Sequence, residues 1–126
     1  MKKVWQHKNM KESLAGALCG LRVMLKTERN ARLIFILGIF VLAAGILLGC
    51  DSKEILIILV VITSVIICEV INTLVENILD IIKPQDDPHV KVLKDISSAA
   101  VLVASIASII IGLIIFTPKL LTLFKH

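Results

Sequence analysis

The sequence is poor in aromatic residues, glycine and proline. Its 126 residues include four Phe, one Trp, no Tyr, six Gly and three Pro. So few Gly and Pro leave little room for loops, and so few aromatic rings leave no set of platforms on which bases could stack. We therefore exclude a disordered chain, a large soluble enzyme and a nucleic-acid-binding module, and we expect no nucleic acid among the partners.

Cysteine is also scarce, and its spacing is uninformative. Cys19, Cys50 and Cys68 are odd in number and share no C-x-x-C spacing. The sequence therefore indicates neither a disulfide framework nor a zinc site.

Charged residues are few, and aliphatic residues are in excess. The chain is 57% hydrophobic and 19% charged, against about 45–50% and about 25% in ordinary soluble domains. A soluble domain of this size would expose many of the surplus Leu, Ile and Val side chains to water. The composition therefore predicts an all-α integral membrane protein, folded as a single membrane domain over residues 1–126.

Three apolar stretches are long enough to cross a membrane as helices. We predict transmembrane helices at about residues 32–50, 55–82 and 89–117. The third is expected to stop near Pro118, because proline breaks helices. Before the first stretch, apolar side chains recur at helical spacing between charged ones, which predicts an amphipathic surface helix at about residues 7–29.

The distribution of basic residues predicts the orientation. Eight of the 14 Lys and Arg lie in residues 2–32, before the uncharged stretch that begins at Leu33, and three lie in residues 83–94, before the uncharged stretch that begins at Ile96. One lies between the first and second spans, and two follow the third. Because Lys and Arg concentrate on the cytoplasmic side, we expect a multi-pass protein of the cell membrane with a cytoplasmic N-terminus and an outside C-terminus.

Acidic side chains inside the second predicted span need an explanation. Glu69, Asn72, Glu76 and Asp80 share one helical face with Thr73. An acid in mid-membrane costs at least about 2.5–3.5 kcal/mol and normally faces a partner, an ion or a water path. A structural polar seam bound to Lys or Arg is one interpretation, and Asp80 fits it best because it lies near the helix end.

A catalytic interpretation assigns the same acids to phosphoryl chemistry. Glu28 and Glu76 are candidate Mg²⁺ ligands, and Lys94 is a candidate for binding a polyphosphate. Glu69 lies deeper in the membrane, where partial desolvation suits a general base. No G-x-x-x-x-G-K-[ST] motif and no kinase-type glycine loop is present. A small non-enzymatic transporter or pore subunit, with the acids along a conduction path, is the competing interpretation.

Three segments carry a resemblance to a known family. They are EVINTLVENILD at residues 69–80, KDISSAAVL at residues 94–102, and Gly20-Leu21-Arg22 followed by Glu28. In these segments, and over nearly its whole length, the chain resembles the small prokaryotic diacylglycerol kinases.

This resemblance implies a membrane homotrimer with a surface helix and three spans per subunit, whose active sites combine adjacent subunits. It also implies transfer of the ATP γ-phosphoryl group to a membrane lipid alcohol, with Mg²⁺ as cofactor. Glu69 is then the catalytic base, and the remaining site residues divide into four groups: Glu28 and Glu76 for metal and ATP, Asn72 and Ser98 for support or substrate binding, Lys94 and Asp95 for ATP, and Gln85, Asp86 and Asp87 for the adenine end.

The resemblance leaves two acceptor lipids open. Residues 26–32 and 112–119 look closer to the branch of the family that phosphorylates undecaprenol. We therefore expect an undecaprenol kinase, with a diacylglycerol kinase that makes phosphatidic acid as the alternative.

Overall fold

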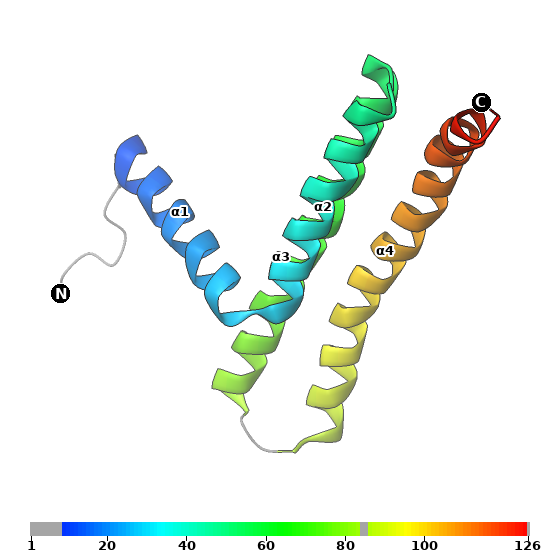
Figure 1. The fold of residues 1–126 in the computed structure, drawn as a ribbon. Helices are drawn as coiled ribbons and strands as arrows, with labels where there is room; N and C mark the ends of the chain where they lie inside the picture. The colour runs from blue at the N-terminus through cyan, green and yellow to red at the C-terminus, as the bar shows by residue number, and fades with distance from the viewer. Residues whose placement is uncertain (1–8, 84–85, 126) are drawn as a thin grey trace.

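The protein is built from four α-helices. The structure is a computed structural model that describes residues 9–83 and 86–125. The helices are α1 (Met10–Thr27), α2 (Arg29–Leu47), α3 (Ser52–Ile82) and α4 (Pro88–Leu123), as Figure 1 shows. The all-helical fold is confirmed, and helices α2, α3 and α4 are each long and apolar enough to cross a membrane.

Helices α1 and α2 meet at a sharp elbow. Helix α1 begins after Asn9, whose Oδ1 accepts a hydrogen bond from the Glu12 amide at 2.9 Å. It ends where Glu28 adopts an extended conformation with φ of −98° and ψ of 114°. The second helix then starts at Arg29 rather than at residue 32. The first two residues of the helix predicted at 7–29 lie outside the described residues.

A tight turn joins α2 to α3. Helix α2 ends at Leu47, three residues before the predicted end, and Gly49 has a φ of 73°, a conformation that favours glycine. Asp51 and Glu54 then form a capping box: Asp51 Oδ1 accepts from the Glu54 amide at 2.9 Å, and Glu54 Oε2 accepts from the Asp51 amide at 2.8 Å. Helix α3 therefore begins at Ser52 rather than at residue 55.

The predicted end of the third span near Pro118 is wrong, because α4 continues through this proline to Leu123. A proline inside a helix removes one backbone N–H donor and disturbs the preceding turn. The stretch beyond it is attached to α3 by an ion pair of 2.8 Å between Lys119 Nζ and Glu54 Oε2. This tertiary contact stabilises the last turns of α4.

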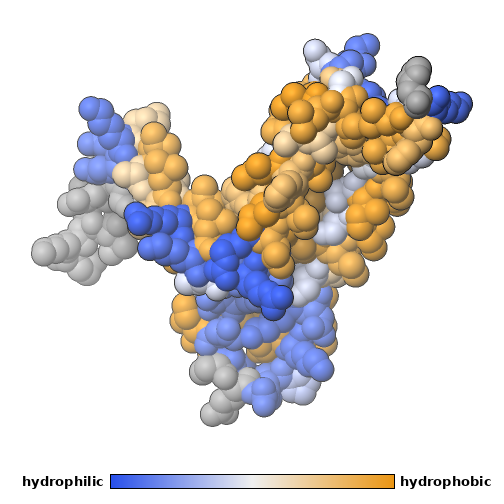
Figure 2. Space-filling model, viewed as in Figure 1, coloured by the Kyte–Doolittle hydropathy of each residue, from blue (hydrophilic) through white to orange (hydrophobic). Residues whose placement is uncertain are grey.

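Most apolar side chains lie on the outside of the molecule. Among the described residues only five apolar ones are buried: Met24, Ala31, Ile58, Val65 and Ile115. Figure 2 shows hydrophobic side chains over most of the length of the spans, while hydrophilic ones gather at the elbow and where α3 meets α4. This distribution fits helices surrounded by lipid or by other subunits.

Small residues allow α2 to approach α3 closely. Gly38 and Gly45 are buried on α2. A Cβ at Gly38 would lie 2.8 Å from Ile62 Cγ2, and one at Gly45 would lie 3.0 Å from Ile58 Cδ1. Gly112 on α4 is different, because a Cβ there meets no atom within 4 Å. The α2–α3 contact therefore depends on the absence of side chains at two positions.

Alanine at these glycines should have opposite effects on stability. We expect Gly112→Ala to raise the free energy of unfolding by about 0.5–1 kcal/mol, because alanine is the better helix former. Gly38→Ala should instead lower it by about 1–3 kcal/mol, because the added methyl group overpacks the contact with Ile62. Thermal unfolding in detergent micelles measures both, and equal shifts for the two variants would contradict the proposed packing.

Candidate functional site

A buried polar cluster links α3 to α4 near the elbow. Among the described residues, Glu69 and Asn72 are the buried polar side chains, with 4% and 9% of their surface exposed. Asn72 Nδ2 donates to Glu76 Oε1 at 3.3 Å, and Ser97 Oγ donates to Asn72 Oδ1 at 2.7 Å. Asn72 therefore bonds on both sides of its amide, and its orientation is fixed between the two helices.

Two further carboxylates lie close to this cluster. Glu28 lies at the elbow, and Glu76 lies on α3 two turns beyond Glu69 and accepts the hydrogen bond from Asn72. Glu28 is half-buried and makes no capping hydrogen bond to α2. Three predicted site residues, Glu28, Glu69 and Glu76, therefore come from two separate segments. The Glu69 side chain is buried, and the Glu28 side chain makes no capping hydrogen bond.

The acids do not form a self-contained metal centre. Within residues 9–83 and 86–125, no three His, Cys, Asp or Glu side chains are grouped so that they could hold a metal ion. Mg²⁺ commonly takes only one or two carboxylates and completes its shell with water and phosphate oxygens. Glu28 at the elbow and Glu76 on α3 have the carboxylate oxygens that such an arrangement uses.

Lys94 lies at the same end of the molecule but already has an acidic partner. Its Nζ forms an ion pair with Asp80 Oδ1, which joins the end of α3 to the beginning of α4. This contact matches the structural interpretation of Asp80. Asp95, the next residue, is exposed. A phosphate group that reached Lys94 would therefore compete with Asp80.

A polar groove of about 520 Å³ lies between the end of α3 and the beginning of α4. It is lined by Asp80, Lys83, Asp86, Asp87, Pro88, Val90, Lys91 and Lys94. Of the three residues predicted at the adenine end, Asp86 and Asp87 line this groove, whereas Gln85 lies outside the described residues.

Asp87 also has a structural role at the start of α4. Its Oδ1 accepts from the His89 amide at 2.8 Å, and it forms an ion pair with Lys83. The Lys83 ammonium, and after it the His89 amide, lower the pKa of the Asp87 carboxyl below its ordinary value. Asp87 therefore stabilises this helix end as a carboxylate.

The cap should make the first turn of α4 sensitive to acid. A lowered folded-state pKa contributes stability that is complete above the ordinary aspartate pKa of about 3.9 and is lost as the pH falls through the folded-state value. We expect amide-exchange protection at Val90 and Lys91 to be constant from pH 7 to about pH 4 and to fall below it. Asp87→Asn should make protection independent of pH; a pH dependence retained in that variant would contradict this role.

The structure distinguishes Ser97 from Ser98. Ser98 is exposed, and its Oγ donates to the Lys94 carbonyl at 2.9 Å. Ser97 instead contacts Asn72 across the helix interface. The sequence places both serines one turn beyond Lys94, and only the rotation of α4 against α3 decides which one faces the cluster.

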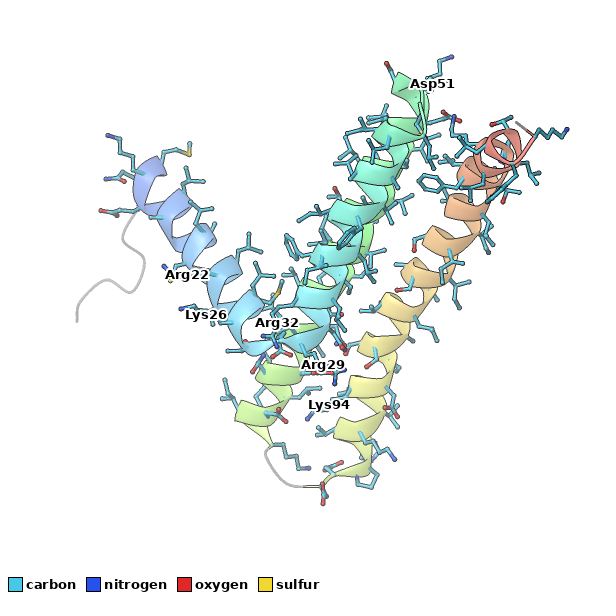
Figure 3. The ribbon with its side chains drawn as sticks, viewed as in Figure 1. Arg22, Lys26, Arg29, Arg32, Asp51 and Lys94 are labelled. Carbon is cyan, nitrogen blue, oxygen red and sulfur yellow. The ribbon has the colours of Figure 1, made fainter. Side chains whose placement is uncertain are left out.

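Arg32 holds the elbow together, a role that the sequence did not indicate. Its Nη1 donates to the carbonyls of Leu25 at 3.1 Å and Lys26 at 2.8 Å, the last turn of α1. A cation at this position satisfies unpaired carbonyls and complements the helix dipole. In Figure 3, Arg32 lies with Arg22 and Lys26 at the elbow, far from Asp51. Arg32 thereby fixes the geometry around Glu28.

Removing this guanidinium should loosen the elbow. With spin labels at Leu18 and Leu37, both exposed, we expect Arg32→Gln to broaden the distance distribution between α1 and α2. Glutamine is too short to reach the two carbonyls and carries no charge. Arg22→Gln removes a nearby charge but no such bond and serves as the control; equal broadening in both variants would contradict the role of Arg32.

The chain is similar to known proteins over most of its length. The family model described as prokaryotic diacylglycerol kinase matches residues 15–116. The undecaprenol kinase of Bacillus subtilis is 36% identical over 101 residues, which cover 80% of this chain and 82% of that protein. The diacylglycerol kinase of a Synechocystis species is 32% identical over 124 residues, which cover 97% and 71%. These matches include the elbow, the acidic face of α3 and the Lys94–Asp95 pair.

Proposed function

Because the chain belongs to the prokaryotic diacylglycerol kinase family and is an ATP-dependent lipid kinase, we propose that it phosphorylates undecaprenol. The observation that carries the site assignment is the burial of Glu69 on α3, together with the hydrogen bond between Asn72 and Glu76 further along the same helix. The family assignment also favours the catalytic interpretation of these acids over a transporter or pore.

Glu69 acts as the general base in this proposal. Its carboxylate takes the proton of the lipid hydroxyl while that oxygen attacks the γ-phosphorus in line and ADP leaves. Asn72 keeps Glu76 in position through its amide, and Ser97 holds Asn72. Ser97 therefore takes the supporting role that we expected for Ser98.

The nucleotide end of the site combines the elbow with α3 and α4. Glu28 and Glu76 are the residues that would hold Mg²⁺, and the ion would supply positive charge to the phosphate oxygens. Lys94 exchanges Asp80 for a phosphate group, and Asp95 lies beside it. Asp86 and Asp87, which line the polar groove, form the adenine end.

The membrane arrangement follows from charge and exposure. The concentration of basic residues in residues 2–32 and 83–94, which lie at the same end of the spans, supports a cytoplasmic N-terminus and an outside C-terminus in the cell membrane. Helix α1 lies on the membrane surface as an amphipathic helix. A homotrimer with active sites shared between subunits is supported by the small number of buried apolar residues in each chain.

The choice of undecaprenol rests on two sequence comparisons. Residues 26–32 and 112–119 look closer to the undecaprenol branch, and the relative named undecaprenol kinase has the higher identity of the two, 36% against 32%. The relative named diacylglycerol kinase aligns over more residues, 124 against 101. Diacylglycerol therefore stays the alternative acceptor.

A direct assay tests the acceptor. Purified protein in micelles receives Mg²⁺ and ATP labelled in the γ-position, with undecaprenol or diacylglycerol offered separately. We expect label in undecaprenyl phosphate at a higher kcat/KM than in phosphatidic acid. The reverse preference would overturn the acceptor assignment, and label in neither lipid would favour the transporter interpretation.

A further inference from the structure

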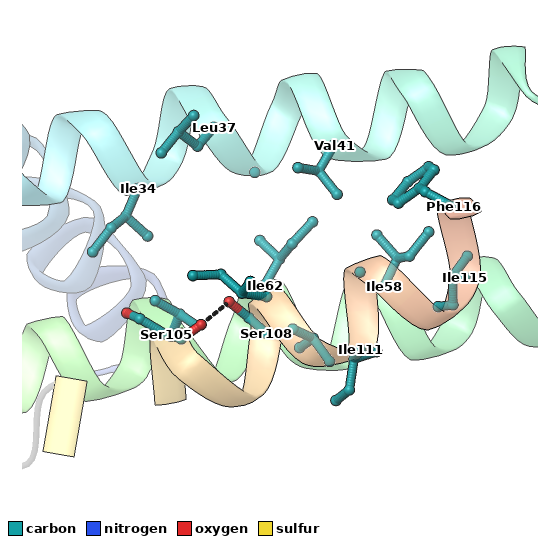
Figure 4. A pocket seen from close by; sticks show the side chains of 15 residues that line it. Ile34, Leu37, Val41, Ile58, Ile62, Ser105, Ser108, Ile111, Ile115 and Phe116 are labelled. Carbon is teal, nitrogen blue, oxygen red and sulfur yellow. Dashed lines mark hydrogen bonds between the residues drawn. The ribbon is translucent and has the colours of Figure 1, made fainter. Parts of the chain in front are cut away.

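Helix α4 packs loosely on the other helices. Among its described residues only Ile115, near the C-terminal end, is buried. An apolar cavity of about 370 Å³ lies between α2, α3 and α4, and in Figure 4 the side chains of Val41, Ile62 and Phe116 point into it from these three helices. A helix that buries so little apolar surface gains little stability from packing. Its polar contacts with α3 therefore contribute a large part of its attachment.

Three polar side-chain contacts join residues of α4 to residues of α3, within the ranges 9–83 and 86–125 that the structure describes. They are the ion pair of Lys94 with Asp80, the hydrogen bond from Ser97 to Asn72, and the ion pair of Lys119 with Glu54. On α3, Asn72 and Asp80 are eight residues apart, which is about 12 Å along the axis. The third contact lies at the other end of α3. Two of the three contacts therefore hold the beginning of α4.

The proposed mechanism breaks one of these two contacts. When a phosphate group takes the place of Asp80 beside Lys94, α4 loses its ion pair to the end of α3. The hydrogen bond from Ser97 Oγ to Asn72 Oδ1 has no part in that exchange, and it is shielded because Asn72 is buried and Ser97 is half-buried. A hydrogen bond shielded from water is stronger than an exposed one. Among the described residues, this bond is then the remaining polar contact between α3 and the beginning of α4.

The Ser97 hydroxyl has two acceptors for one proton. Its Oγ lies 2.7 Å from Asn72 Oδ1 and 2.9 Å from the Lys94 carbonyl oxygen. The Lys94 carbonyl also accepts from Ser98 Oγ at 2.9 Å, whereas Ser97 is the one donor to Asn72 Oδ1 in the described part of the chain. Without this proton, a buried acceptor on Asn72 would be left unsatisfied. The proton therefore contributes most at Asn72, where it joins the two helices.

We propose that Ser97 is a positioning residue that keeps α4 in place on α3 while nucleotide occupies Lys94. The inference rests on the proposed function, because it needs Lys94 to exchange Asp80 for phosphate. Asn72 also donates to Glu76 at 3.3 Å, so the same bond keeps the Glu76 carboxylate oriented while the ion pair is broken. Ser97 touches no reacting group and acts through Asn72.

Asp80→Asn breaks the ion pair without any nucleotide and so isolates the contribution of Ser97. The position of α4 is measured by the distance distribution between spin labels at Ile78 on α3 and Val92 on α4, both exposed, in labelled protein diluted with an excess of unlabelled protein. We expect narrow distributions in Asp80→Asn and in Ser97→Ala, because each retains one contact, and a broad one in the double variant. Addition of a non-hydrolysable Mg-ATP analogue should broaden the distribution in Ser97→Ala and leave that of the wild type narrow.

Two further serine variants serve as controls, each combined with Asp80→Asn. Ser97→Thr keeps the hydroxyl and should restore the narrow distribution. Ser108→Ala removes a hydroxyl that bonds within α4: its Oγ donates to the Ser105 carbonyl at 2.7 Å, as Figure 4 shows. This variant should stay narrow as well.

Kinetics separate positioning from a merely structural role. We expect Ser97→Ala to raise KM for Mg-ATP about fivefold, the ordinary contribution of one hydrogen bond, with kcat at saturating Mg-ATP within about twofold of the wild type. Ser97→Thr should restore KM, and Ser108→Ala should leave both constants unchanged. A lower kcat at unchanged KM would overturn the inference.

Two structural outcomes would also overturn it. A broad distribution in Ser97→Ala without nucleotide would show that the bond is needed in the resting protein already, and a narrow one in the double variant would show that other contacts hold α4. Neither outcome depends on catalysis. Absence of lipid labelling in the wild type would instead overturn the proposed function, on which the inference rests.

Discussion

Glu69→Gln is expected to lower kcat for lipid phosphorylation by about 10²–10⁴-fold, the usual contribution of a general base. Glutamine has nearly the same shape and keeps hydrogen bonding at this buried position, but it does not accept the hydroxyl proton. Because the change leaves Glu28 and Glu76 in place, KM for Mg-ATP should change little. Steady-state kinetics in micelles separate the two parameters.

A matched substitution controls for the loss of a carboxylate. Glu54 lies at the other end of α3, in the turn with Asp51 and paired with Lys119. Glu54→Gln should keep kcat within about twofold, since it touches none of the reacting groups. Unchanged kcat in a folded Glu69→Gln protein would remove Glu69 from the mechanism, and circular dichroism establishes that the variant is folded.

Glu28→Gln and Glu76→Gln should act on the nucleotide instead. Each removes one negative oxygen ligand from the proposed Mg²⁺ site, so we expect KM for Mg-ATP to rise about tenfold or more, with a higher Mg²⁺ requirement at fixed ATP. Initial rates measured while Mg²⁺ is varied at fixed ATP, and while ATP is varied at fixed Mg²⁺, give the Mg²⁺ requirement and KM for Mg-ATP.

The same titrations can contradict the assignment of Glu69 to the chemical step and of Glu28 and Glu76 to metal binding. A fall in kcat at unchanged KM for Mg-ATP would place Glu28 or Glu76 in the chemical step rather than in metal binding. Glu54→Gln again serves as the control and should leave both constants unchanged.

The three spans were predictable because an uncharged aliphatic run of about 18 residues or more is typical of a transmembrane helix. Their ends were harder to predict. The capping box of Asp51 and Glu54 was present in the sequence as a signal, and it would have given the start of α3 at Ser52. Pro118 misled the prediction of the end of α4, since the helix continues through it to Leu123, with Lys119 paired to Glu54.

The candidate site was predictable along one helix but less so between helices. Helical periodicity places Glu69, Asn72 and Glu76 on one face, and the hydrogen bond between the last two agrees with it. Periodicity within α3 carries no information about the rotation of α4, which brings Ser97 rather than Ser98 to Asn72. The bonds of Arg32 to α1 depend on the elbow, which the sequence did not specify.

A single-turnover experiment tests the central claim, that Glu69 activates the lipid hydroxyl at a site which binds Mg-ATP independently of it. Wild type and Glu69→Gln, each in excess over labelled ATP, are mixed with Mg²⁺ and the preferred lipid in micelles, and labelled lipid is measured against bound nucleotide. We predict equal nucleotide binding by both proteins and rapid label transfer by the wild type alone. Transfer by Glu69→Gln at the wild-type rate would contradict the account.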